Sequence, residues 1–372
     1  RKGVKMPTFD IIKKIEIKQK SFRIAQVCDQ FDFNQNTIIE HFKGDFTLPD
    51  EWNIGVIVGR SGTGKTTIAK EIFGNVIQSF EHKADSVIDD FDKNIKSDEL
   101  FNVLTQVGFS SPPSWLKPYS VLSNGEKMRI DLAMAILQNK DIIVFDEYTS
   151  VVDREIAKIG SLATQKIIRK LDKKFIAVTC HYDVVEWLQP DFIFSTDDYT
   201  MKYTRGLLQR PEIRLDIYQA KGYWDMFRKY HYLSHNLNKS AREYIAVYKD
   251  KPIAFCSVLN FPHPKIKPMW KIHRIVVLPD YQGIGIGKKL LNFIADLYAQ
   301  KNEYIGITTS LNGFAKSLLN DKAHWRFIHA GKHSKNKGVK ESLDKARPIN
   351  RNTYSFRYSK TMTKQRSENA IH

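Results

Sequence analysis

The sequence predicts two α/β domains joined in one chain. Its 372 residues exceed the usual size of a domain, which is about 100 to 200 residues. Two glycine-rich loops, at residues 59–67 and 282–287, lie more than two hundred residues apart. Each loop stands between a short apolar run and an amphipathic stretch, and that order is typical of a strand, a phosphate-binding turn and a helix. We therefore expect one phosphate-binding loop in each domain.

The first loop carries the pattern of a nucleotide-binding P-loop. Residues 59–66 fit G-x-x-x-x-G-K-[ST], the apolar run 54–58 predicts a buried strand before it, and residues 65–73 predict a helix after it. Loop amides would hold a β-phosphate, Lys65 would bridge the β- and γ-phosphates, and the Thr66 hydroxyl would bind Mg²⁺. The residues predicted to bind ATP here are Gly59, Ser61, Gly62, Gly64, Lys65, Thr66 and Thr67.

Two adjacent acids follow a second apolar strand at residues 141–145. Asp146 at the end of such a strand is typical of a residue that holds Mg²⁺, and Glu147 of one that polarises an attacking water. An exposed turn is the alternative, but the wholly apolar strand before the acids disfavours it.

Through these motifs, residues 20–200 resemble the nucleotide-binding domain of the ABC ATPases. Leu122–Glu126 is similar to the signature motif, residues 150–153 to the D-loop, and His181 after an apolar strand to the switch histidine. The resemblance implies ATP contacts from Gln106, Ser123, Gly125 and Asp153. It also implies Mg²⁺ contacts from Thr66, Gln106 and Asp146, and hydrolysis by Glu147 and His181.

The signature region departs from the family at several positions. Asn124 stands where glycine is usual and Glu126 where glutamine is common, and Asp131 and Met134 also weaken the match. The resemblance implies an ATP-dependent homodimer in which each signature motif completes the partner's ATP site. The short stretch from Gln106 to Ser123 leaves little room for the arm that grips membrane partners, so we expect no membrane protein as partner. Phe31 and Phe33 are alternative adenine-stacking residues.

The C-terminal half predicts a second sheet with a phosphate loop of another kind. Strands are expected at 212–217, 244–248, 253–259, 275–278 and 303–309, and helices at 223–232 and 288–300. Together with residues 274–291, this order resembles the GNAT acyltransferases over residues 211 to about 360. The resemblance implies that the Q-x-x-G-x-G loop binds the pyrophosphate of acetyl-CoA or another acyl-CoA and that a neighbouring strand pairs with the pantetheine arm. The residues predicted to bind acyl-CoA are Val276, Val277, Leu278, Gln282, Gly283, Gly285, Gly287 and Lys288.

The groups that run the transfer are less clearly marked. An amine that attacks a thioester needs a base, and the leaving thiolate needs an acid. His231, within an aromatic and histidine cluster, His273 and Tyr354 are the candidates for acyl transfer. Packing within the core is the alternative for each of them.

Charge is divided unevenly along the chain. Residues 1–205 contain 28 lysines and arginines against 29 acids, whereas residues 206–372 contain 30 against 12. Such a positive field attracts polyanions, of which nucleic acid is the commonest large one, although a solvated lysine-rich surface is the alternative. The absence of long apolar runs or a recognisable signal peptide, and three cysteines without C-x-x-C spacing, predict a cytoplasmic protein without a membrane span.

The domains are predicted as an ABC-type ATPase at 1–205, a GNAT acyltransferase at 206–360 and a basic tail at 361–372. This combination resembles a family that fuses the two domains. We expect an ATP-dependent N-acyltransferase that modifies a base of DNA or tRNA. The alternatives are an ATP-regulated acetyltransferase for proteins or small molecules, and a nucleic-acid-associated ATPase whose GNAT domain only senses acyl-CoA.

Overall fold

The computed structural model divides the chain into two compact units that do not follow the order of the sequence. It describes residues 8–16, 21–31, 37–77, 79–138, 140–231, 236–263, 266, 268–333 and 351–359. Unit 1 comprises Arg1–Phe80, Gln138–Val152 and Thr164–Pro211, and unit 2 comprises Glu81–Leu137, Asp153–Ala163 and Glu212–His372. The segment between the two nucleotide motifs therefore belongs to the same unit as the C-terminal sheet.

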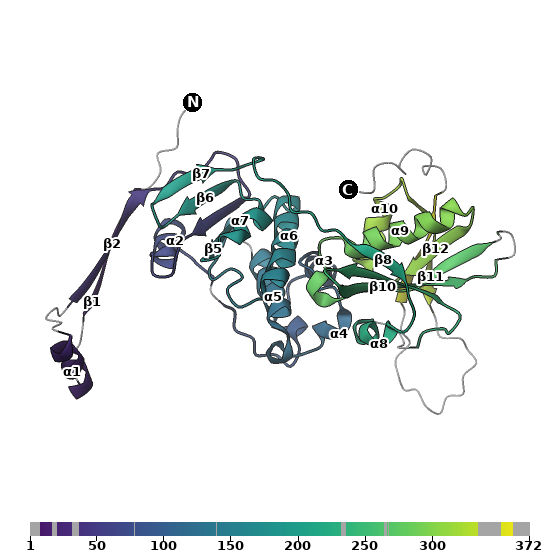
Figure 1. Ribbon diagram of the computed structural model, residues 1–372, viewed down its shortest axis with the longest axis horizontal. Helices are drawn as coiled ribbons and strands as arrows, with labels where there is room; N and C mark the ends of the chain where they lie inside the picture. The colour runs from purple at the N-terminus through teal and green to yellow at the C-terminus, as the bar shows by residue number, and fades with distance from the viewer. Residues whose placement is uncertain are drawn as a thin grey trace. The chain divides into compact units, whose positions relative to one another are not determined.

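Unit 1 is built on a five-stranded sheet in the order β4-β5-β3-β6-β7. The first four strands in this order run parallel and β7 is antiparallel to β6, so the carboxyl ends of β3, β4 and β5 meet at one edge (Figure 1). The elements of unit 1 are β1 (Thr8–Glu16), α1 (Phe22–Gln30), β2 (Thr37–Asp45), β3 (Ile54–Val58), α2 (Lys65–Phe73), β4 (Ile142–Phe145), β5 (Lys174–Thr179), α7 (Asp183–Leu188), β6 (Phe192–Ser195) and β7 (Thr200–Tyr203). Helix α6 (Arg154–Lys170) begins in unit 2 and ends in unit 1.

The first part of unit 2 is a group of short helices. They are η1 (Val87–Asp90), α3 (Ser97–Gln106), α4 (Pro112–Trp115), η2 (Tyr119–Val121) and α5 (Asn124–Leu137). A buried network holds α5 in this group, because Asp131 accepts hydrogen bonds from the Tyr119 hydroxyl at 2.8 Å and pairs with His82 Nε2 at 2.9 Å. Burial raises the pKa of Asp131. Asp131, which departs from the ABC pattern, thus has a structural partner on either side.

The second part of unit 2 is a seven-stranded sheet in the order β13-β14-β12-β11-β10-β9-β8. All neighbouring strands are antiparallel except β11 and β12, which are parallel. The elements are β8 (Asp216–Gln219), α8 (Trp224–Phe227), η3 (Arg228–Tyr230), β9 (Arg242–Tyr248), β10 (Lys251–Asn260), β11 (Met269–Val277), η4 (Pro279–Tyr281), α9 (Ile286–Gln300), β12 (Tyr304–Thr309), α10 (Asn312–Leu319), β13 (Trp325–His333) and β14 (Arg351–Tyr358).

Alternating residues of this sheet divide between two cores. Ala254 and Cys256 of β10 pack in the large cluster that contains α9 and α10, whereas Phe255 packs with Trp224 and Phe227 of α8. Figure 1 shows α9 and α10 on one face and α8 on the other. The two faces are called here the α9 face and the α8 face.

Strands β11 and β12 separate partway along their length. They pair only from Met269↔Tyr304 to Ile272↔Ile307, although β11 continues to Val277. At the same point the β10–β11 register shifts, because Val258 pairs with Ile272 and Ser257 with Arg274. His273 is therefore the extra residue of a β-bulge, at the place where the two parallel strands part.

Several sequence predictions need correction. The predicted strand at 212–217 begins only at Asp216, where pairing with β9 starts; Ile213 and Leu215 pack against the large core without joining the ladder, which explains their alternation. The predicted helix at 223–232 is reduced to α8 and η3, and residue 232 lies outside the described residues. The domain boundary at 205 stays a prediction, as does the tail at 361–372, which lies outside the described residues.

No helix in the described part of the chain is long and apolar enough to cross a membrane. Three of the aromatics that lie among the lysines and arginines of residues 322–366 are Trp325, Phe356 and Tyr358. They are core residues, so their rings are not available to stack on the bases of a nucleic acid.

We predict that Asp191 is the main polar anchor of the unit 1 sheet. Its buried carboxylate accepts from the amides of Asn53 and Ile54 at 2.8 and 3.0 Å and pairs with Arg169. Asp191→Ala leaves these donors without an acceptor and should lower the free energy of unfolding of unit 1 by about 3 kcal/mol, measured by urea denaturation. Asp141→Ala, at an exposed position, is the control, and an equal loss in both variants would contradict the prediction.

Candidate active sites

The first glycine loop has the geometry of an anion cradle. The amides of Gly62, Gly64, Lys65, Thr66 and Thr67 donate no hydrogen bond within the described part of the structure, and they lie at the N-terminus of α2, where anions are favoured. Gly64 has φ +83, and a Cβ there would lie 2.5 Å from the Phe42 ring. The loop therefore requires glycine at this position and is suited to hold phosphates.

Lys65 and Thr66 are placed as the motif predicts. Lys65 Nζ donates to the carbonyls of Gly59 and Arg60 at 2.9 and 2.8 Å, and it can leave these weak acceptors for a phosphate. The Thr66 hydroxyl donates to Asp146 Oδ2 at 2.8 Å. A hydroxyl and a carboxylate at this separation provide oxygen ligands that Mg²⁺ prefers.

Glu147 and His181 follow the neighbouring strands β4 and β5. Glu147 is exposed and has φ 50, so its side chain stands clear of the strand. The Thr179 hydroxyl donates to the Tyr148 carbonyl at 3.0 Å and accepts from the His181 amide at 3.1 Å. This threonine links the turns that carry the two residues predicted for ATP hydrolysis.

The signature segment begins α5 with a reciprocal cap. The Ser123 amide donates to Glu126 Oε2 at 3.1 Å, and the Glu126 amide donates to Ser123 Oγ at 3.3 Å. This arrangement is a capping box, which serine or threonine forms with glutamate or glutamine three residues later. Glu126 departs from the glutamine common in the family but makes the same cap that a glutamine would make.

Gln106 and Asp153 occupy helix ends in unit 2. Gln106 is the last residue of α3 and is half-buried. Asp153 is exposed and caps α6, because its carboxylate accepts from the Glu155 amide at 2.8 Å. Their predicted roles at ATP are compatible with these positions and stay predictions.

The second glycine loop is also an anion cradle. Residues Gly283 to Lys288 donate no amide hydrogen bond within the described structure, and the last three begin α9. Six consecutive free amides fit a pyrophosphate. The Lys288 ammonium pairs with Asp321 at 2.9 Å. Lys288 therefore offers a phosphate its backbone amide and not its side chain.

The strand before the loop has an open edge. Beyond Ile272, β11 has no pairing with β12 among the described residues, so this end of β11, which contains Val276 and Val277, has an edge without a strand partner. The Val277 carbonyl accepts from Gln282 Nε2 at 2.7 Å, and the Leu278 amide donates to the Ile253 carbonyl. The loop is thereby held against the end of this strand.

The same loop is in contact with the segment that follows α3. Gln282 Oε1 accepts from both the amide and the hydroxyl of Ser110, at 2.8 and 2.6 Å. Gly108 and Gly283 have φ +90 and +89, and a Cβ on Gly108 would lie 2.7 Å from the Gln282 carbonyl oxygen. Only glycine allows the two backbones to approach in this way. Sequence reasoning missed this contact, because Gly108 carries no motif.

A buried arginine connects the signature helix to η4. Arg129 is fully buried, donates to the Asp280 carbonyl at 2.7 Å and lies 3.7 Å from its carboxylate. Asp280 is also close to the signature motif, since a Cβ on Gly125 would lie 3.0 Å from Asp280 Oδ1. Nearby, Tyr281 donates to Glu155 of α6. The predicted signature motif and the predicted acyl-CoA loop therefore share one interface.

The three candidates for acyl transfer have different surroundings. His231 is buried and packs edge-on against Trp224 at 5.7 Å, which favours packing; the residues after it, 232–235, lie outside the described structure. Tyr354 is half-buried in β14 opposite Thr309. His273 stands at the bulge where β11 leaves β12, and its ring Nδ1 is buried without a hydrogen-bond partner among the described residues. His273 is thus the candidate that stands on β11 at the start of the open edge.

We predict that His273 is neutral at pH 7. Burial lowers its pKa from 6.5 to about 4, and the charge of Arg274 acts in the same direction. The unfolded chain then binds more protons than the folded chain between these values, so His273 weakens stability as pH falls from 6.5 to about 4. Histidine NMR with His273→Gln for assignment should give a midpoint near 4, and a midpoint near 6.5 would contradict the prediction.

Comparisons with known proteins find relatives of two kinds. The sequence model described as "Acetyltransferase (GNAT) family" matches residues 182–320, a range that begins before β6. An elongation factor 3 from Gonapodya prolifera is 24% identical over 46% of this chain and 17% of its own length. An uncharacterized ABC transporter ATP-binding protein from Haemophilus influenzae is 30% identical over 32% of this chain and 61% of its own length. The energy-dependent translational throttle protein EttA of Mycobacterium tuberculosis is 28% identical over 38% of this chain and 31% of its own length.

Solved structures of both kinds are also similar to parts of the chain. An IAA acetyltransferase from Bacillus cereus covers 32% of this chain and 77% of its own, with a TM-score of 0.25 and 21% identity. The similarity to a dimeric bacterial ABC transporter cassette covers 53% of this chain and 100% of the cassette, with a TM-score of 0.38 and 15% identity. The chain spans less than two thirds of the length of the elongation factor and of the Haemophilus protein. The chain joins an ABC-type ATPase part to a domain of the GNAT acetyltransferase family.

Proposed function

We propose that the protein is an ATP-dependent acyl-CoA N-acyltransferase that modifies a base of a nucleic acid. The observation that carries the proposal is the contact of two helical segments with η4 and the loop before α9: Arg129 of the signature helix donates to the Asp280 carbonyl, and Ser110 after α3 donates to Gln282. A change at the signature motif is thereby transmitted to the loop that binds the acyl donor.

The ATPase part would bind ATP in the first cradle. Loop amides and Lys65 would hold the phosphates, Thr66 and Asp146 would provide oxygens for Mg²⁺, and Glu147 and His181 are the residues that would act on the attacking water. Mg²⁺ neutralises charge on the phosphates when bound. By its resemblance to the ABC ATPases, the chain would form an ATP-closed homodimer in which Ser123 and Gly125 of one subunit would meet the γ-phosphate of the other.

The acyltransferase part would bind the donor along the loop and the open edge of β11. An exocyclic amine of the base attacks the thioester carbonyl, so a C–N bond forms and the C–S bond breaks. The amine loses one proton and the leaving thiolate gains one. His273, neutral at pH 7, can accept the first proton, and the Tyr354 hydroxyl is the candidate donor of the second.

The nucleic-acid acceptor is supported by charge. The excess of 30 basic over 12 acidic residues belongs to residues 206–372 alone, and a field of this sign attracts phosphates. Much of the basic tract, at 334–350 and 360–372, lies outside the described residues. We also propose a cytoplasmic location, because three cysteines without C-x-x-C spacing fit a reducing compartment.

A sensor role for the acetyltransferase domain is the second candidate. The contact between Ser110 and Gln282 would also serve an ATPase that responds to acyl-CoA without transferring an acyl group. In that case the ATPase rate would depend on acyl-CoA and no acceptor would be modified.

We expect labelled acetyl-CoA to mark one nucleoside when the protein is incubated with ATP and with separate DNA, tRNA and protein pools. Mass spectrometry of digested products identifies the acceptor. Label on a nucleoside that disappears without ATP supports the proposal. Label on protein or a free amine, with none on nucleic acid, favours the alternative acetyltransferase, and no label on any pool favours the sensor.

We predict that Glu147→Gln uncouples ATP binding from turnover. Loss of the water-orienting carboxylate should lower ATP hydrolysis by about 10²- to 10⁴-fold while ATP still binds. Acyl transfer to a polynucleotide should fall with it, measured with the same label, and Lys65→Ala serves as a control that cannot hold the phosphates. Unchanged transfer to the polynucleotide by Glu147→Gln would show that hydrolysis does not gate the reaction.

We predict that ATP and acetyl-CoA influence each other's binding through the Ser110–Gln282 contact. Coupling between two sites is reciprocal and typically changes affinity by about 5- to 150-fold. Calorimetry on the Glu147→Gln background should show an acetyl-CoA affinity that depends on ATP, and Ser110→Ala should reduce this dependence because it removes one of the two hydrogen bonds to Gln282. Ser97→Ala, at an exposed position of α3, is the matched control. An acetyl-CoA affinity that is identical with and without ATP would refute the coupling.

A further inference from the structure

Three cations lie in one row across the C-terminal sheet. Lys271 of β11 is paired with Gly306 of β12, Gly306 with Arg357 of β14, and Arg357 with Arg326 of β13. Residues in register on neighbouring strands point to the same face of a sheet. Lys271, Arg357 and Arg326 are called here the cation row, and Gly306 leaves a gap within it.

The cation row lies on the α8 face of the sheet. The residues that alternate with it, Trp270, Ile305 and Phe356, pack in the core on the α9 face. Helix α8 covers a different part of the α8 face, because its core cluster contains Phe255 of β10 and Val276 near the end of β11. Arg326 is exposed, and Arg357 and Lys271 are half-buried. Ligands can therefore approach the row from solvent.

The row is electrostatically unfavourable in the protein alone. Arg326 and Arg357 stand directly opposite each other, an arrangement that is destabilising for like charges. Within the described residues, none of the three cations has a carboxylate partner, and Arg357 Nε is buried without a hydrogen bond. Burial also lowers the pKa of Lys271. An anion bound at the row would remove this repulsion and satisfy the buried donor.

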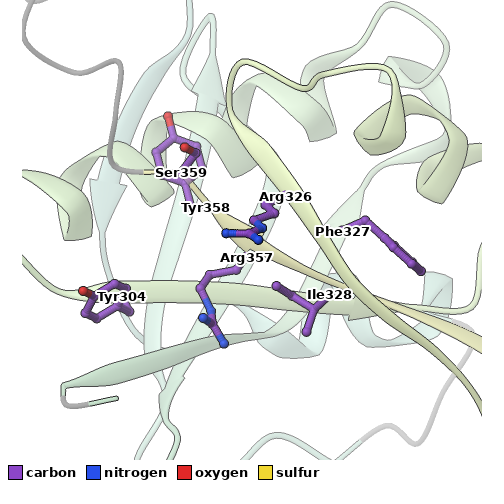
Figure 2. A pocket seen from close by; sticks show the side chains of 7 residues that line it. All are labelled: Tyr304, Arg326, Phe327, Ile328, Arg357, Tyr358 and Ser359. Atoms are coloured by element: carbon purple, nitrogen blue, oxygen red, sulfur yellow. The ribbon is translucent and has the colours of Figure 1, made fainter. Parts of the chain in front are cut away.

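A cavity of about 520 Å³ adjoins the two arginines. It is lined by Tyr304, Arg326, Phe327, Ile328, Arg357, Tyr358 and Ser359. Figure 2 shows Arg326 and Arg357 beside each other between Tyr304 and Ile328, with Phe327 directed away from them. Guanidinium groups bind phosphate oxygens through two parallel hydrogen bonds, and an aromatic ring beside them can stack on a base.

The row is one step from the place where β11 and β12 separate. The next position on this face of β12 is Thr308, whose hydroxyl lies 2.9 Å from that of Ser355. Two residues along a strand span about 6.6 Å. A phosphate at the row would thus hold a chain next to the open edge where the acyl group is expected.

We propose that the cation row binds backbone phosphates of a single-stranded nucleic acid and presents a neighbouring base to the acyl-CoA site. This inference rests on the proposed function and names the binding surface of its substrate. A nucleic acid fits better than an acidic peptide, because the cavity combines two arginines, which pair with phosphate oxygens, with the aromatic ring of Tyr304, on which a base can stack.

The test is the salt dependence of binding. Fluorescence anisotropy with labelled single-stranded DNA and RNA of about 16 nucleotides is measured on the full chain, on Arg326→Gln, on Arg357→Gln and on the double variant. Each lost phosphate contact should reduce the slope of log K against log salt by about 0.7. Lys301→Gln, which removes an exposed charge at the end of α9, should leave both slope and affinity unchanged.

Folding and specificity are checked in parallel. The arginine variants should melt no lower than the parent, because they remove repulsion, and should bind acetyl-CoA as the parent does. A double variant with the parent's slope and affinity would overturn the proposal. Competition by polyglutamate as strong as that by unlabelled oligonucleotide would overturn the choice of nucleic acid, and complete competition by inorganic phosphate at equal phosphate concentration would overturn the choice of a polymer.

The outcome separates this inference from the proposed function. Nucleoside labelling by a double variant that binds oligonucleotide normally would refute the role of the cation row in binding and would support the acyltransferase activity. Oligonucleotide binding that depends on the cation row, without label on any nucleoside, would support the binding role of the row and refute acyl transfer to a nucleic acid.

Discussion

The close approach of Gly108 to Gln282 and Gly283 is the constraint on which the arrangement of unit 2 depends. Both glycines adopt positive φ, and a Cβ on either would collide with the backbone or side chain of the facing segment. The approach brings the Ser110 donors onto Gln282 and places Arg129, fully buried, beside Asp280. The Asp280 side chain is 35% exposed and 3.7 Å from the guanidinium, so the closer contact is the hydrogen bond that Arg129 donates to the Asp280 carbonyl at 2.7 Å. Helix α5 and η4 are therefore held in one relative position.

This interface and the ligand cradle use different groups of the same loop. The contact with α5 and with the segment after α3 engages the Asp280 carbonyl and the Gln282 side chain, whereas the amides from Gly283 to Lys288 donate no hydrogen bond within the described residues. A protein contact that occupied those amides would compete with phosphate directly. Because it does not, the contact with the helical segment leaves the cradle open to phosphate.

Local features were predictable from the sequence and long-range contacts were not. The strand, loop and helix at 54–73 and the second loop with α9 were predicted within a few residues, because apolar periodicity and glycine spacing are local signals. The family resemblance of both parts was confirmed. The pair Ser110–Gln282 joins residues 172 positions apart, and no local pattern marks either Gly108 or Arg129. The strand at 212–217 was misplaced because alternation reports which side is buried, not whether a partner strand is present.

The bulge at His273 and the cation row bear on the same chemistry in opposite directions. Burial and Arg274 lower the His273 pKa to about 4, so the ring is neutral but a weak base. A general base is most effective when its pKa is near the working pH. Negative charge bound two residues away at Lys271 would favour the protonated ring and raise this pKa. An acceptor that carries phosphates would in this way strengthen the base that accepts its proton, whereas a neutral amine bound in the same place would leave His273 as weak as it is in the free protein.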